Sequence, residues 1–112
     1  MSDADLLRRA AGLMRRDAEA ALAEAPTRTD MPREYPERGA WQTYFAARIG
    51  GHVGLYAAFF HPVVALAAAD WLDNEAGHFD ATVRGLGVPE SDAAGAYTYP
   101  LAFARAYLGE PA

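Results

Sequence analysis

The residue pair best suited to catalysis or metal binding is Glu75 and His78. The two residues are three apart in a stretch with helical periodicity. On a helix this spacing places a carboxylate and an imidazole on one face, and carboxylate-bridged di-metal bundles use the same E-x-x-H motif. Those bundles carry the motif twice, whereas this chain carries it once. Asp70 and His61 are the residues nearby that would complete a metal site. A metal-binding helical protein or enzyme is therefore one alternative, and a solvent-facing polar helix face is the favoured interpretation.

No other set of residues forms a catalytic pattern. The chain has no cysteine, which excludes disulfides, thiolate catalysis and zinc sites built on cysteine. Its serines and threonines are not flanked by the glycines of a hydrolase nucleophile elbow, and its glycine pairs lack the lysine of a phosphate loop. We therefore expect no cofactor and favour a non-enzymatic role.

His61 has a simpler structural role available. It precedes Pro62, and a residue before proline is pushed out of the α region, whereas proline suits the first position of a helix. His61 is therefore expected to cap backbone N–H groups or to pack its ring against the turn. A change of charge near neutral pH is the alternative role for this side chain.

Two arginine pairs, Arg8-Arg9 and Arg15-Arg16, lie seven residues apart and project from a similar side of the first helix. They could contact phosphate or an acidic partner, so nucleic-acid binding is a second alternative. Acidic residues are interspersed with them, and the whole chain has a net charge of −5 with 10 basic and 15 acidic residues. Because DNA binding needs a basic surface, nucleic acid is disfavoured as a partner and a solvated helix face is preferred.

Aromatic residues are numerous for a chain of 112 residues, with two Trp, six Tyr and five Phe. One small core has limited room for them, and exposed aromatics are typical of protein interfaces. Trp41, Tyr44, Tyr97 and Tyr99 are the interface candidates. The alternative is that the aromatic rings fill gaps in an alanine-rich core.

The length and the 52% hydrophobic content predict one helical domain over residues 1–112. Apolar residues at helical spacing predict helices at 2–25, 52–60, 62–86 and 100–108. The buried stripe of the helix at 62–86 is expected to consist of Val64, Ala68, Trp71, Leu72, Phe79, Val83 and Leu86. Proline-rich and small polar segments predict loops at about 26–40 and 87–99.

Residues 41–49 fit two patterns. Alternating apolar residues indicate a short strand or hairpin, while the spacing of Trp41, Tyr44 and Phe45 also fits a helical turn. We favour a helix there, and so expect an all-α fold, a compact bundle of four to five helices. No apolar run is long enough to span a membrane.

Three blocks of the sequence resemble small proteins of actinobacteria and their phages. They are LLRxAAxLMR from Leu6, HPxVALAxADWLD from His61 and PLAxARAYL from Pro100, where x marks a position outside the resemblance. The resemblance implies an accessory protein of phage or prophage origin in the bacterial cytoplasm, and it supplies no catalytic residue. We therefore expect the chain to bind another protein, with a second copy of itself as one such partner.

Overall fold

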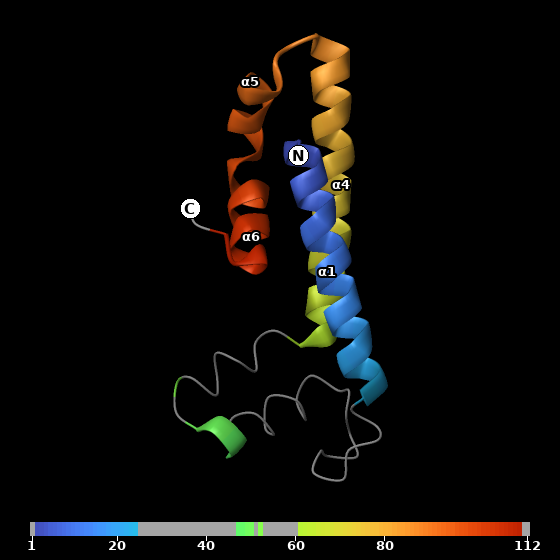
Figure 1. Cartoon of the computed structure of the whole chain (residues 1–112), viewed down its shortest axis with the longest axis vertical. Coiled ribbons are helices and arrows are strands. Elements are labelled where there is room, and N and C mark those ends of the chain that lie inside the picture. The colour runs from blue at the N-terminus through green and yellow to red at the C-terminus, as the bar shows by residue number, and fades with distance from the viewer. Residues whose placement is uncertain (1, 25–46, 51, 53–60, 111–112) are drawn as a thin grey trace. The chain divides into compact units, whose positions relative to one another are not determined.

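The computed structural model of the chain describes residues 2–24, 47–50, 52 and 61–110. All regular secondary structure in these ranges is helical, which confirms the all-α class. The elements, shown in Figure 1, are α1 (Asp3–Glu24), α4 (Pro62–Leu86), α5 (Glu90–Ala94), the 3-10 helix η2 (Gly95–Tyr97) and α6 (Thr98–Leu108). No helix within the described ranges is long and apolar enough to cross a membrane.

The predicted strand or hairpin at 41–49 falls mostly outside the described residues. Residues 47–49 are helical, and residues 41–46, with Trp41 and Tyr44, lie outside the ranges above. The loop predicted at 26–40 and most of the helix predicted at 52–60 also lie outside them. The strand and the compact bundle both stay predictions.

The chain divides into two compact units, one of Met1–Arg15 with Ala67–Ala112 and one of Arg16–Leu66. The first unit holds the beginning of α1, most of α4, and all of α5, η2 and α6. The second unit holds the end of α1 and the start of α4. The description of packing that follows concerns the first unit.

The start of α1 is fixed by its capping side chain. Ser2 Oγ accepts a hydrogen bond from the Asp5 N–H at 3.1 Å, as the spacing of these two residues predicts for a helix N-terminus. Asp3 and Asp5 in the first turn are also favoured by the positive end of the helix dipole. The helix therefore begins within one residue of the predicted position.

Ion pairs show the register between α1 and α4. Arg8 contacts Asp80 at 2.6 Å, and Arg15 contacts Asp70 at 2.8 Å and Asp73 at 2.5 Å. Later residues of α1 thus meet earlier residues of α4, so the two helices are antiparallel.

The buried side chains of α1 and α4 repeat with spacings of three and four, and many of them are alanines. They are Ala4, Leu7, Ala11 and Met14 on α1, and Ala69, Leu72, Ala76 and Phe79 on α4. Trp71, which was expected in the buried stripe, is 39% exposed. Because small side chains let helices approach closely, Ala69 and Ala76 face the core together with Leu72 and Phe79, while Trp71 lies beside this stripe.

The helix α6 lies antiparallel to α4. The rings of Trp71 and Phe103 are 5.6 Å apart, and those of Phe79 and Tyr97 are 5.2 Å apart, both edge to face. The helix starts at Thr98 rather than at the predicted Pro100, since proline is tolerated anywhere in the first turn. It ends at the predicted Gly109, which adopts a left-handed conformation with φ 73°.

The loop predicted at 87–99 is wrong over most of its length, because α5 and η2 occupy it. Its small polar residues are typical of a turn, but the tertiary structure holds them in helices. Ala93 is buried, and Glu90 Oε1 accepts a hydrogen bond from the Asp3 N–H at the start of α1 at 2.5 Å. These long-range contacts outweigh the weak local preference of a short helix.

Candidate functional site

The four residues of the predicted metal site do not form one. In the part of the chain that the structure describes, no group of three or more His, Asp or Glu side chains is placed to hold a metal ion. Asp70 is engaged by Arg15 at 2.8 Å, and His78 is exposed on α4. The E-x-x-H spacing puts Glu75 and His78 on one helix, but among the described residues no facing helix adds the carboxylates that a di-metal site needs.

His61 caps α4, as its position before Pro62 predicts. Its side chain is 2% exposed, and Nδ1 accepts a hydrogen bond from the Val63 N–H at 3.0 Å. This bond satisfies one of the free donors at the helix N-terminus. A buried imidazole used in this way is a structural residue.

The arginines of α1 contact carboxylates within the fold. Arg15 bridges Asp70 and Asp73. Its hydrogen bonds to these carboxylates, the larger effect coming from Asp70, raise the pKa of the guanidinium above the ordinary value. The hydrogen bond with Asp80 likewise raises the pKa of Arg8. Both side chains thus join α1 to α4.

The two remaining arginines of the predicted basic face differ. Arg9 contacts Glu110, which follows α6, at 3.4 Å. Arg16 is 74% exposed and lies 3.8 Å from Asp17. A phosphate backbone would compete with a carboxylate at each of these arginines, which opposes the nucleic-acid alternative.

The two tyrosine candidates near α6 have different surroundings. Tyr97 is half-buried, packs edge to face on Phe79 and shares a hydrogen bond of 3.1 Å with the Thr82 hydroxyl. Tyr99 is 85% exposed. Tyr97 therefore contributes to the packing of the fold and its interface role stays a prediction, while Tyr99 lies at the surface.

Trp71, Phe103 and Tyr99 form what we call the aromatic patch. Trp71 is 39% exposed although its ring packs on that of Phe103. Tyr99 lies four residues before Phe103 on α6, hence on the same face of that helix. Sequence reasoning assigned Trp71 to the core. The repeat of Ala69, Leu72 and Ala76 would have placed it on the outside.

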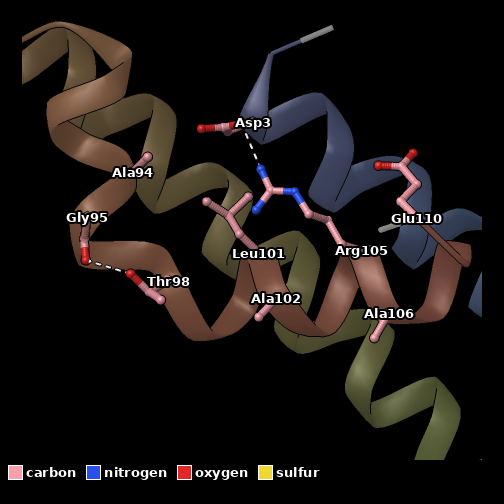
Figure 2. A pocket seen from close by; sticks show the side chains of 9 residues that line it. All are labelled: Asp3, Ala94, Gly95, Thr98, Leu101, Ala102, Arg105, Ala106 and Glu110. Carbon is pink, nitrogen blue, oxygen red and sulfur yellow. Dashed lines mark hydrogen bonds and ion pairs between the residues drawn. The ribbon is translucent and has the colours of Figure 1, made fainter. Parts of the chain in front are cut away.

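A groove of about 470 Å³ opens between the start of α1, the end of α5 and η2, and α6. We call it the Arg105 groove. Figure 2 shows its lining, Asp3, Ala94, Gly95, Thr98, Leu101, Ala102, Arg105, Ala106 and Glu110. No sequence pattern predicted this groove, because its walls come from three separate segments.

Comparison with protein-family models, with curated proteins and with solved structures finds no match for this chain. The functional argument therefore rests on the aromatic patch and the groove themselves.

Proposed function

We propose that the protein is a non-enzymatic accessory protein of phage or prophage type that acts by binding another protein through the aromatic patch. The observation that carries this proposal is the exposure of Trp71 and Tyr99, at 39% and 85%, beside half-buried Phe103 on the α4–α6 face. Tryptophan and tyrosine are the residues most enriched at the energetic centres of protein interfaces.

The indole of Trp71 is held by a ring contact within the patch. The edge-to-face contact between Trp71 and Phe103 fixes the indole before any partner arrives. A partner would therefore lose little conformational entropy in ordering this side chain, and more of the burial energy would appear as affinity.

The surroundings of Trp71 suggest the character of the partner. Next to the indole is a surface hollow lined by Arg15, Asp70, Trp71, Asp73 and Asn74. One arginine faces two carboxylates there, and Asp70 is 78% exposed. A partner with apolar residues flanked by a lysine or arginine would complement this surface in shape and charge.

The biological setting rests on the three sequence blocks that resemble small proteins of actinobacteria and their phages. The second of these blocks contains Trp71, so one residue of the aromatic patch is among those that carry the resemblance. A role in the host cytoplasm belongs to the same proposal.

The test is site-specific photo-cross-linking in an actinobacterial host, with a photoreactive phenylalanine at position 99. The cross-linked protein is identified, purified and titrated against the wild type, Tyr99→Ala, Trp71→Ala and the control Leu86→Ala. Leu86 is 72% exposed at the far end of α4, so its loss controls for the removal of exposed apolar surface. We expect the two patch variants to weaken binding by about tenfold or more, and the control to leave it unchanged.

Two results would count against the proposal. One is that no protein cross-links at position 99. The other is a purified partner that binds Tyr99→Ala and wild type with equal affinity. Sedimentation of the protein alone tests a second copy as the partner, which requires a dimer that Tyr99→Ala dissociates.

A further inference from the structure

We propose that the Arg105 groove is a binding site for a carboxylate that carries a short apolar body. The groove shares no lining residue with the aromatic patch, so this inference does not depend on the proposed function. Three observations support it: the volume and apolar lining of the groove, the N–H donors that Arg105 retains, and the stabilisation of the two neighbouring carboxylates by groups other than Arg105.

The walls of the groove suit a small apolar body. Leu101 forms the floor at 3% exposure, and most of the other α5 and α6 positions are Ala or Gly. These short side chains leave a space of about 470 Å³. Sites for small molecules are commonly of this size, mostly apolar, with a few polar groups that orient the ligand.

Arg105 supplies the polar group. Its side chain is 39% exposed and reaches toward the start of α1, as Figure 2 shows. Its guanidinium lies 3.8 Å from Asp3 Oδ1, which is longer than a hydrogen bond. A guanidinium has five N–H donors in a planar fork that matches a carboxylate, so Arg105 retains donors for a ligand.

The two carboxylates of the groove are stabilised without Arg105. Asp3 lies in the first turn of α1, where the helix dipole favours a negative charge. Glu110 is 3.4 Å from the guanidinium of Arg9. When a ligand carboxylate binds Arg105, Glu110 keeps the cation of Arg9 and Asp3 keeps the field of the helix dipole. The cost is the loss of the ion pair between Asp3 and Arg105 and the repulsion between Asp3 and the ligand.

The experiment measures binding of octanoate to the ¹⁵N-labelled full chain by NMR, with octylamine and octanol as probes of the same length. We expect octanoate to shift the amide signals of residues 94–106 at lower concentration than octanol, and octylamine to bind no better than octanol. An N-acetylated Leu-Leu peptide, with a free or an amidated carboxyl end, separates a free acid from the end of a peptide chain. Tighter binding of octylamine than of octanoate would assign the site to Asp3 and Glu110 and overturn the proposal.

Variants locate the site. Arg105→Gln should weaken octanoate binding by about tenfold, whereas the control Arg84→Gln, on the exposed face of α4, should leave it unchanged. Ala102→Trp fills the groove from an exposed helix position and should abolish binding with Arg105 still present. Circular dichroism verifies that each variant is folded. The proposal is wrong if folded Arg105→Gln and folded Ala102→Trp bind octanoate as the wild type does.

Discussion

The contact of Tyr97 with α4 allows a direct test of its role in the fold. The Tyr97 hydroxyl lies 3.1 Å from Thr82 Oγ1, and the Tyr97 ring packs edge to face on Phe79, which is 1% exposed. Tyr97→Phe removes the hydroxyl and keeps the ring. Thr82→Val removes the other partner at nearly constant volume. The two single variants and the double variant form a thermodynamic cycle that isolates the hydrogen bond.

The expected magnitudes follow from the burial of the groups. Both hydroxyls are partly buried, so each single variant should lower the free energy of unfolding by about 1 kcal/mol, with a coupling energy of about 0.5–1 kcal/mol. Tyr97→Ala also removes the ring contact with Phe79, and should cost about 2–3 kcal/mol.

Urea denaturation followed by circular dichroism measures these free energies. The reasoning predicts that the double variant is more stable than the sum of the two single losses implies. Strictly additive losses would show that the two hydroxyls do not interact. A Tyr97→Ala variant as stable as the wild type would show that Tyr97 does not contribute to the packing of the fold.

Three further stability predictions use matched pairs of variants. Arg15→Gln should cost about 1 kcal/mol, because Arg15 bridges two carboxylates, whereas Arg16→Gln, on an exposed side chain, should change stability by less than about 0.5 kcal/mol. Because the pKa of Arg15 is raised in the folded state, its contribution to stability is fully present at pH values below the unfolded-state pKa. Urea denaturation at neutral pH therefore measures the full effect. Equal losses of stability in Arg15→Gln and Arg16→Gln would contradict the bridge. His61→Ala removes the cap and should cost about 1 kcal/mol, whereas His61→Asn keeps an acceptor. His61→Ala should therefore lower the thermal midpoint more than His61→Asn does, and the reverse order would refute the capping role. Gly87→Ala should destabilise because φ is 64°, while Gly85→Ala, inside α4, should stabilise by about 0.5–1 kcal/mol, and the same sign for both in calorimetry would contradict the backbone argument.

Several features of the fold are encoded locally and were predictable from the sequence. Ser2 caps α1, Pro62 begins α4 with His61 as its cap, and Gly109 ends α6. Each of these features depends on the conformational preference of one residue and on backbone groups within a few positions. Such preferences act wherever the segment lies in the fold, which is why the helix boundaries could be read from the chain.

The orientation of each helix face was decided by tertiary packing. Trp71 seemed to belong to the core by its hydrophobicity, yet alanines such as Ala69 and Ala76 are buried and Trp71 is 39% exposed. Close approach of helices selects small side chains, and a pattern that counts large apolar residues does not register this geometry. The aromatic patch exists because the alanines, and not Trp71, occupy the buried face of α4.

The candidate sites show the same division. The sequence showed which residues are candidates for chemistry or binding: the E-x-x-H pair, the paired arginines and the interface candidate Tyr99. Only the tertiary structure decided that Arg15 binds Asp70 and Asp73, that Tyr97 packs on Phe79, and that Arg105 faces a groove opposite Asp3. The physical reason is that these contacts join residues of separate helices, whose register depends on the whole set of packed side chains and on no local spacing.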